Sequence, residues 1–421
     1  MDSTRRSTSL DIREKPLYRS VSLHVPLESH PTIDVEEWEE EDGVSLTAHS
    51  TLDATAPLLP REGSVTGWLV IFASFLNHFI VNGTQYAYGV FLSHYQTELY
   101  RDVSSTTLTM IGTLSSASLS LFAILPGRLA DRYGYRKTMA IGYVLVIAGE
   151  VLASFATQPW QLFLTQGLMC GLGSSFTYVP AVSAPSQWFQ RRRGMAVGFA
   201  VSGSGIGGFA LNPAVEWSIT KIGVHWTLRA LAIATGVIGC IVLALLKRNP
   251  DAQRNCHQQQ HHLEEKEKKT SPFMRHKIIH DLRSMFALSL FKDARFSALF
   301  IAGFVTSLGY LVPFFLLPIY AQHVGIDATR AALLVGILNG SSALGRLAMG
   351  VIADALGRLL ILFLSLVASA ASCAFLWTFA TSFQILIAFA ILYGVAIGGF
   401  VSLLPVLLAD LFGILSSIVF S

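Results

Sequence analysis

The chain contains 421 residues, of which 52% are hydrophobic and only 14% are charged, and its formal net charge at pH 7 is +3. A soluble domain carries about a quarter charged residues, so this composition excludes an ordinary soluble protein and indicates a surface covered mostly by lipid. The small net charge also gives no indication of binding to nucleic acid.

Residues 1–64 are rich in serine, threonine, proline and charged side chains, and they include the acidic run from Asp34 to Asp42. Such a segment cannot bury enough apolar surface to offset the entropy lost on ordering, so we expect a disordered cytoplasmic tail. The tail contains no early apolar stretch of the kind found in signal peptides. The first membrane-spanning helix is therefore expected to direct insertion.

Apolar stretches of about 20 residues recur from Gly67 onward, and each is long enough to cross a hydrocarbon core about 30 Å thick as a helix. They lie at residues 67–91, 106–126, 138–157, 160–182, 194–216, 227–247, 296–320, 329–352, 358–379 and 383–407. The sequence thus predicts an all-α membrane protein of two halves. An N-terminal six-helix bundle (65–247) and a cytoplasmic loop (248–295) precede an incomplete C-terminal bundle of about four helices and a stub (296–421).

The distribution of basic residues predicts how these helices are oriented in the membrane. Of the 30 lysines and arginines, we place only four on the side opposite the N-terminus: Arg101, Lys221, Arg229 and Arg330. Because cytoplasmic loops carry the excess of basic residues, we expect the N-terminus and the loop 248–295 in the cytoplasm. The lipid bilayer is the expected partner, and the plasma membrane is the expected location.

Motifs for catalysis or for binding a metal ion are missing from the sequence. The four cysteines have no metal-ligand spacing, and we interpret the three in apolar runs as packing residues: Cys170, Cys240 and Cys373. No intramembrane His/Asp cluster, Ser/His pair or nucleotide-binding loop is present. We therefore expect no enzymatic activity, no metal site and no cofactor.

An internal repeat relates the two halves. Three positions after the second predicted helix recur after the eighth at one constant spacing, with the same residue types: Gly127, Asp131 and Gly134, matched by Gly350, Asp354 and Gly357. Gly173 and Pro180 in the fourth predicted helix are matched by Gly398 and Pro405 in the tenth at nearly the same spacing. Chance coincidence of small residues is the alternative. A parallel duplication of a six-helix unit predicts a solute site between the halves, near the middle of the membrane.

The motifs resemble those of a transporter family. The segment Gly127–Lys137 resembles the cytoplasmic loop motif of the major facilitator superfamily, and Gly350–Arg358 resembles its weaker second copy. The runs Gly171–Gly194, Ser202–Gly208 and Asn339–Arg346 resemble the monocarboxylate transporter-like branch, especially its fungal members. The resemblance covers about residues 62–413. It implies a secondary transporter, a symporter, that moves a small organic anion by alternating access, and we expect a gradient of protons or of the solute itself to drive it.

The loop motif and its copy are the expected conformational switch. Asp131 lies where the second predicted helix meets the cytoplasm, and there it can face a helix N-terminus or neighbouring basic residues. Such a latch is favourable in only one arrangement of the halves. The alternative is a loop that only anchors the topology through its positive charge. The switch residues that we predict are Gly127, Asp131, Arg132, Gly134, Arg136, Lys137 and Asp354.

Arg346 is the most informative single residue, because it lies about two turns inside the eighth predicted helix. A charged side chain there costs about 2.5–3.5 kcal/mol on insertion scales, and such residues are mostly functional. The resemblance implies that this arginine anchors the carboxylate of the solute, which its planar fork of donors suits. The alternative is that its side chain reaches the lipid headgroups.

Polar residues on the helices that face the cavity in this family complete the predicted site. They are Asn82, Tyr86, Tyr178, Tyr310, Asn339 and Tyr393. Any of them could instead serve only helix–helix hydrogen bonds. His78 and Glu150 are the candidates for carrying a coupling proton, although Glu150 could also just pair with a neighbouring helix. The branch's acidic residue and first-helix lysine are replaced here by Ser342 and Tyr86.

Only eight residues follow Gly413, too few for another membrane-spanning helix, whereas the family fold has two more. We therefore expect a C-terminally truncated member of the family. The alternatives to an anion transporter are a transporter of a vitamin or secondary metabolite, a non-transporting sensor, and a non-functional truncated relative.

Overall fold

The computed structural model describes residues 63–247, 293–310 and 312–412, without the side chains of residues 315, 328, 329 and 332. The predicted tail and stub, and nearly all of the predicted loop, lie outside these described residues. Contacts divide the chain into the units Met1–Ala56 and Pro57–Ser421, and every described helix belongs to the second unit. The described residues contain helices and no strands, which confirms the predicted all-helical class.

The first predicted span is a helix with two π-helical turns. It runs through α1 (Val65–Asn77), η1 (His78–Asn82), α2 (Gly83–Tyr86), α3 (Tyr88–His94) and η2 (Tyr95–Leu99). Ser64 caps its start, because the Ser64 hydroxyl accepts the backbone N–H of Gly67 at 3.2 Å. The helix is longer than the predicted range 67–91, because polar residues that end the apolar stretch do not end the helix.

The next three predicted spans are also helical. The second consists of α4 (Ser105–Leu121) and α5 (Ile124–Tyr133), which are bent by 46° relative to each other. The third is α6 (Tyr135–Ala153). The fourth runs through α7 (Pro159–Leu162), η3 (Phe163–Met169) and α8 (Cys170–Trp188), and Pro180 and Pro185 lie inside it without ending it.

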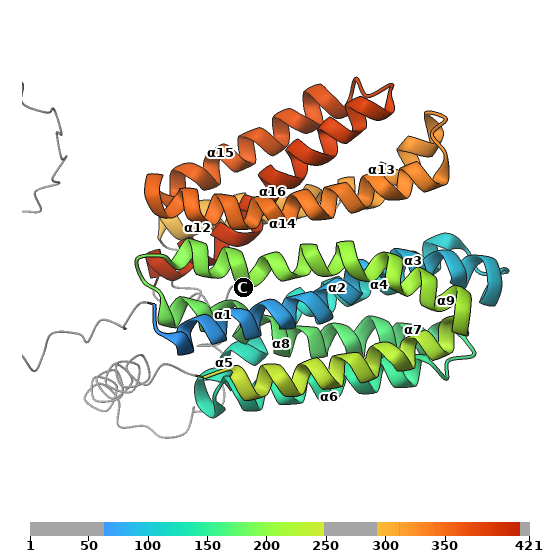
Figure 1. Cartoon of the computed structure of the whole chain (residues 1–421), viewed down its shortest axis with the longest axis horizontal. Helices are drawn as coiled ribbons and strands as arrows, with labels where there is room; N and C mark the ends of the chain where they lie inside the picture. Colours follow the sequence, from blue (N-terminus) through green and yellow to red (C-terminus); the bar gives the residue numbers. More distant parts are fainter. Residues whose placement is uncertain (1–62, 248–292, 311, 413–421) are drawn as a thin grey trace, which may run out of the picture. The chain divides into compact units, whose positions relative to one another are not determined.

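The fifth and sixth predicted spans lie in one element, α9 (Arg193–Leu245). Gly223 breaks this element, because its φ of 82° is outside the helical region and suits glycine. Figure 1 shows the chain reversing direction there. We call residues 193–222 the first arm of α9 and residues 224–245 its second arm.

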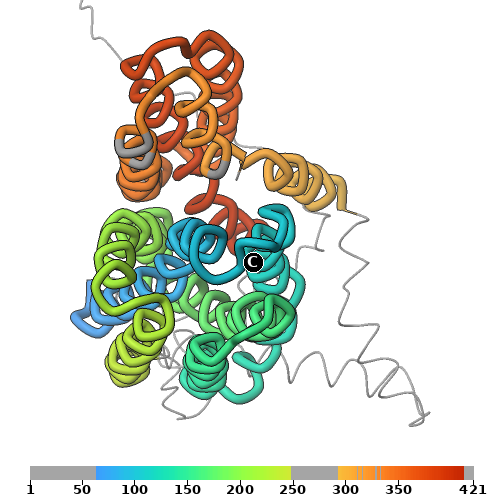
Figure 2. The backbone as a smooth tube through the Cα atoms, turned by 90° about the vertical axis from the view of Figure 1, so that its right-hand side faces the viewer, coloured from blue at the N-terminus to red at the C-terminus, as the bar shows by residue number. Residues whose placement is uncertain are grey.

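The second half contains five helices and one π-helical segment among the described residues: α12 (Ala294–Tyr310), α13 (Val312–His323), α14 (Ala328–Leu356), α15 (Arg358–Ala371), η5 (Ser372–Trp377) and α16 (Phe383–Phe412). Figure 2 shows these orange to red segments as a group beside the blue to yellow-green helices of the first half. Its buried core centres on Leu338, Phe389 and Leu403.

Six helices among the described residues are long and apolar enough to cross a membrane, or seven if the bent pair α4 and α5 is one span. All ten predicted ranges fall on helical segments, but α9 holds two of them. The number of crossings therefore stays a prediction.

The two copies of the loop motif adopt the same turn. Gly134 ends α5 with a φ of 90° and Gly357 ends α14 with a φ of 109°, and in both places the next helix begins at once. The glycine is needed because other residues rarely adopt this conformation. The shared turn supports the predicted duplication.

Glycines let the first arm of α9 pack closely against the first helix of its own half and against α14 of the second half. A Cβ atom at Gly203 or Gly207 would meet the backbone of Phe75 or Phe79 in the first helix. On the other half, α14 lies along the same arm, and Gly194 meets Gly350 backbone to backbone. The glycine run thus serves close helix packing, as the sequence favours.

Gly207→Ala is expected to destabilise the protein by about 1–3 kcal/mol, because the new methyl group must push α9 away from the first helix. Thermal unfolding of the purified protein in detergent measures the effect. Gly309→Ala in α12 is the matched control, since nothing lies within 4 Å of a Cβ atom there and alanine favours helices. Equal unfolding temperatures for the two variants would show that the close packing contributes nothing.

Candidate functional site between the two bundles

Arg346 lies in α14 and is 1% exposed. Its Nη1 donates to the carbonyl oxygen of Val201 at 3.0 Å and to the hydroxyl of Ser204, both on the first arm of α9. Its Nη2 lies 3.5 Å from the hydroxyl of Tyr86. The guanidinium therefore points into the contact between the halves, and the alternative of a side chain reaching the headgroups is wrong.

Arg346 has no acidic partner among the described residues, whose ion pairs all involve other cations. Its Nε, the Nε2 of His78 and the hydroxyl of Ser342 are all buried and have no hydrogen-bond partner among those residues. Buried polar groups are normally satisfied. These three groups therefore lack, within the described part of the chain, the partners that buried polar groups normally have.

A series of aromatic side chains leads from this arginine into the second half. The ring of Tyr86 stacks on that of Phe314 at 6.4 Å, and Phe314 in turn contacts the rings of Tyr310 and Tyr393. The hydroxyl of Tyr393 donates to the carbonyl oxygen of Tyr310 at 2.9 Å. These rings offer an apolar wall beside a single cation.

The π-helical turn η1 brings two more predicted residues to the site. Nδ1 of His78 lies 3.3 Å from the side-chain oxygen of Asn82, and the imidazole meets the ring of Tyr178 edge-on at 5.2 Å. Both His78 and Tyr178 are within electrostatic range of Arg346. Such turns are frequent at functional sites, and nothing in the sequence marks this one.

Asn339 lies at the edge of the same region, but its side-chain amide already forms a hydrogen bond within its own helix. Its amide donates to the carbonyl oxygen of Val335 at 3.0 Å, and its oxygen lies beside Gly208, next to Tyr86. The structure thus brings six of the seven residues predicted for solute binding near the contact between the halves, whereas Tyr393 lies in the core of the second half behind Phe314. We call Arg346, Tyr86, His78 and the rings around them the arginine site.

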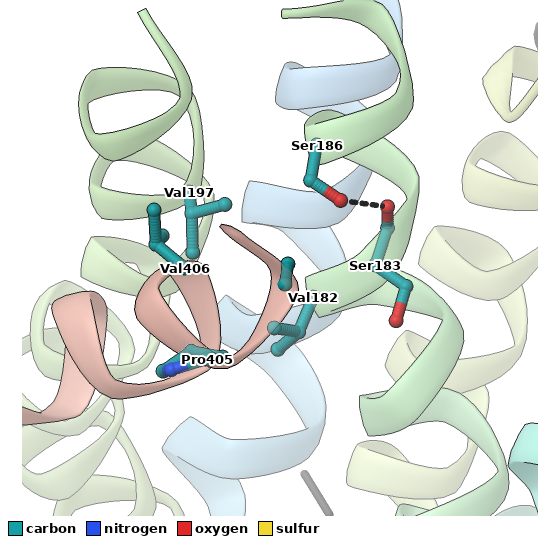
Figure 3. A pocket seen from close by; sticks show the side chains of 7 residues that line it. Val182, Ser183, Ser186, Val197, Pro405 and Val406 are labelled. Carbon is teal, nitrogen blue, oxygen red and sulfur yellow. Dashed lines mark hydrogen bonds between the residues drawn. The ribbon is translucent and has the colours of Figure 1, made fainter. Parts of the chain in front are cut away.

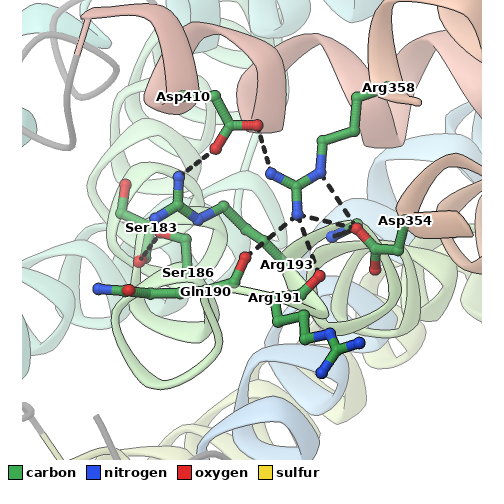
Figure 4. Close-up of polar contacts among 9 residues, drawn as sticks. Ser183, Ser186, Gln190, Arg191, Arg193, Asp354, Arg358 and Asp410 are labelled. Carbon is green, nitrogen blue, oxygen red and sulfur yellow. Dashed lines mark hydrogen bonds and ion pairs between the residues drawn. The ribbon is translucent and has the colours of Figure 1, made fainter. Parts of the chain in front are cut away.

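A second group of charges joins the halves at their predicted cytoplasmic ends (Figure 4). Asp410 of α16 accepts from Arg193 at the start of α9 and from Arg358 at the start of α15. Arg358 also donates to Asp354 at 2.9 Å. We call these four residues the charged cluster.

Asp354 within the charged cluster faces the N-terminus of α9. Its two carboxylate oxygens accept the backbone N–H groups of Gly194 at 2.9 Å and Met195 at 2.8 Å. A carboxylate is favourable there because the N–H groups at a helix start are otherwise unpaired and the helix dipole is positive. The geometry that the sequence predicts for Asp131 is thus found at its repeat partner.

In the first copy of the motif, Arg136 and Arg132 contact residues of the first half. Arg136 donates to the carbonyl oxygens of Leu246 at 2.5 Å and Ala244 at 2.9 Å, at the end of α9. Arg132 lies over the ring of Tyr133 at 5.5 Å. The remaining members of this copy, Gly127, Asp131 and Lys137, lie in α5 and at the start of α6. Sequence reasoning missed Arg193, Arg358 and Asp410, although Arg358 directly follows the repeated glycine.

Next to the charged cluster, four valines that we call the valine group fill the space between the halves. Val182, Val197, Val201 and Val406 form a buried group drawn from α8, α9 and α16. The cavity beside them, shown in Figure 3, measures about 10 Å³. That volume is no larger than one water requires, so no solute fits between the halves at this end.

Glu150 lies elsewhere, inside the first bundle. It is 4% exposed, and the hydroxyl of Thr235 in the second arm of α9 donates to it at 3.4 Å. Its carboxylate therefore faces neighbouring helices of its own half and is not part of the arginine site.

Two helical bundles that meet over a buried, unpaired cation define a membrane transport protein. The sequence profile of the Major Facilitator Superfamily matches residues 68–420. The MFS-type transporter opdF of Penicillium oxalicum is 31% identical over 356 residues, which cover 85% of this chain and 78% of the relative. The agnestins efflux protein AgnL12 of Paecilomyces divaricatus is 30% identical over 365 residues, which cover 86% and 77%.

Among solved structures, the fold is similar to that of the proton:xylose symporter XylE bound to 6-bromo-6-deoxy-D-glucose, with a TM-score of 0.65, 13% identity and coverage of 84% of each chain. The chain belongs to the Major Facilitator Superfamily. It is an integral, multi-pass membrane protein of a family of transporters rather than of enzymes.

Proposed function

We propose that the protein is a secondary transporter of the plasma membrane that moves a small organic anion by alternating access, with the arginine site as its binding site. The observation that carries this proposal is the isolation of Arg346 from every carboxylate among the described residues. An unpaired buried charge is unfavourable. The carboxylate of a solute supplies the missing partner and can accept two donors from one guanidinium.

The lining narrows the class of solute. The ring of Tyr86 lies beside Arg346, and the rings of Phe314, Tyr310 and Tyr393 follow it, which favours a monocarboxylate with an aromatic or apolar body. A relative named as an efflux protein for agnestins supports export of a secondary metabolite. This combines the expected monocarboxylate-type transport with the alternative of a metabolite transporter. We propose symport, in which the anion and a proton cross together and no net charge moves.

The charged cluster and the loop Gly127–Lys137 form the proposed switch, with the N-terminus in the cytoplasm. For the solute to reach the cytoplasm, the contacts of Asp354 and Asp410 with α9 must break and the valine group must separate. Both contacts are made in the arrangement described here. They therefore stabilise one state of the transport cycle over the other.

Transport of a carboxylate and its neutral amide by reconstituted protein tests the proposal. We expect vesicles that contain the full chain to take up the aromatic monocarboxylate hippurate faster than lactate, because the rings of the arginine site can contact an aromatic body. Hippuramide matches hippurate in shape but lacks the charge, so we expect the protein not to transport it. Protein-free vesicles are the control for leakage. Equal uptake of hippurate and hippuramide would contradict an anion site.

A further inference from the structure

A cavity lined by apolar and polar side chains lies inside the first bundle, apart from the arginine site. It measures about 60 Å³ and therefore has room for more than one water. Polar side chains from several helices line it: Thr84, Gln85, Ser115, Glu150, Gln166 and Ser174. We call it the Glu150 cavity.

The carboxylate of Glu150 is the only acidic group in the lining, and the lining contains no lysine, arginine or histidine among the described residues. The hydrogen bond that this carboxylate accepts from the Thr235 hydroxyl, at 3.4 Å, is long and comes from a neutral group. An ionised carboxylate is very unfavourable in such a place, whereas the neutral acid is tolerated. The hydroxyl of Thr84 is also buried without a partner among the described residues.

The titratable groups on the helices around Glu150 do not supply a counter-charge. Tyr88 from α3 and Cys170 from α8 line the cavity, and Tyr95 from η2 lies behind Gln166, to which it donates at 3.0 Å. The basic side chains on the second arm of α9 are directed to Ser154, one turn beyond Glu150: His225 to its carbonyl oxygen and Arg229 to its hydroxyl. The remaining elements around the cavity contribute no charged side chain to its lining.

A single short helix connects this cavity to the arginine site. Thr84 and Gln85 of α2 line the Glu150 cavity, and the next residue, Tyr86, places its hydroxyl 3.5 Å from Arg346. The helix is flanked by the π-helical turn η1 on one side and by Ala87, with a ψ of −1°, on the other. A small shift of α2 therefore changes both sites together.

We propose that the Glu150 cavity is a proton-binding site, and that α2 couples its protonation to occupancy of the arginine site. A proton from water bonds to one carboxylate oxygen of Glu150, and the charge of the cavity changes from −1 to zero. The coupling rests on the proposed anion transport, whereas the proton binding does not. His78 is the less suitable carrier, because its complete burial and, to a smaller extent, the nearby Arg346 both disfavour a positive charge on its ring.

Infrared difference spectroscopy of the full chain in lipid nanodiscs tests the proton site without any solute. Changing the pH in potassium buffer is expected to produce a band of a protonated carboxyl group in the wild-type protein. Glu150→Gln, which is isosteric and removes a buried charge, must abolish this band. Glu98→Gln, at an exposed carboxylate of the same bundle, must retain it. A band that persists in Glu150→Gln, or that responds to sodium at constant pH, overturns the proposal.

Thr235→Val provides a second test of the proton site in case Glu150→Gln fails to fold. It keeps the carboxylate but removes the hydroxyl that donates to it, so the same band must remain while its midpoint pH shifts. An unchanged midpoint would overturn the assignment to Glu150.

Transport then tests the coupling. In vesicles, Glu150→Gln is expected to abolish the accumulation of hippurate driven by a pH gradient but to retain exchange of hippurate for hippurate. Accumulation that survives the substitution overturns the coupling. If the carboxyl band behaves as expected and the wild-type protein moves no hippurate, the proposed solute is wrong and the proton site stands.

Discussion

Arg346→Gln is expected to lower the initial rate of hippurate transport by roughly 10- to 100-fold, because a hydrogen bond to a charged group contributes about 1.5–3 kcal/mol. Glutamine can still donate toward Val201 and Ser204, so the contact between α14 and α9 is partly retained. What it lacks is the positive charge that pairs with a carboxylate. Uptake into vesicles containing equal amounts of folded protein measures the loss.

Arg346→Lys separates charge from shape at the same position. Lysine keeps the charge but not the planar fork, so we expect an intermediate loss of roughly tenfold, expressed mainly in the KM for hippurate. Arg330→Gln is the control, because Arg330 is an exposed cation at the start of the same helix. If Arg346→Lys transported hippurate as well as the wild-type protein, the bidentate hydrogen bond between Arg346 and the solute would not form.

Asp410→Asn is expected to open the predicted cytoplasmic end of the protein. Asp410 lies between Arg193 and Arg358, so its neutralisation leaves two cations side by side and destabilises the closed arrangement. Losing charged hydrogen bonds worth about 1.5–3 kcal/mol shifts a two-state equilibrium by about tenfold or more. Transport is expected to slow, because one state of the cycle becomes too stable.

Cysteine labelling measures this opening directly. Ser186 is buried beside the small cavity between the halves, so Ser186→Cys, in a background without the native cysteines, reports access from the cytoplasmic side. We expect Asp410→Asn to accelerate its reaction with a membrane-impermeant maleimide. Asp327→Asn, an exposed acid at the other end of α14, must leave the rate unchanged. Equal rates in Asp410→Asn and wild type would mean that the charged cluster does not hold the halves together.

The helical class and the position of the site follow from local patterns in the sequence. Apolar stretches predict the helices because the bilayer fixes their length. Arg346 stands out because a charge inside such a stretch is rare, and the repeat predicts a site between the halves. For these reasons six of the seven predicted solute-binding residues lie near the contact between the halves.

Features that depend on contacts between distant residues were not predicted. Arg193 and Asp410 are 217 residues apart, and no local pattern indicates that their side chains meet. The π-helical turn at His78–Asn82 and the turn at Gly223 arise from packing and backbone geometry that residue type alone does not reveal. Glu150 was recognised as an intramembrane acid, but its separation from the arginine site required the positions of Thr84 and Thr235.

The glycines of the first arm of α9 have a consequence for how fast the halves can exchange positions. Where Gly198 meets α14, the nearest atoms of α14 are backbone atoms of Arg346 and Gly350, and no side chain lies between them. Interlocked side chains must change rotamer before two surfaces slide, whereas smooth backbone surfaces need not. This stretch of the arm can therefore slide along α14 without rotamer changes, and the barrier to rocking depends on the valine group, the hydrogen bonds of Arg346 and the ionic contacts at the start of the arm.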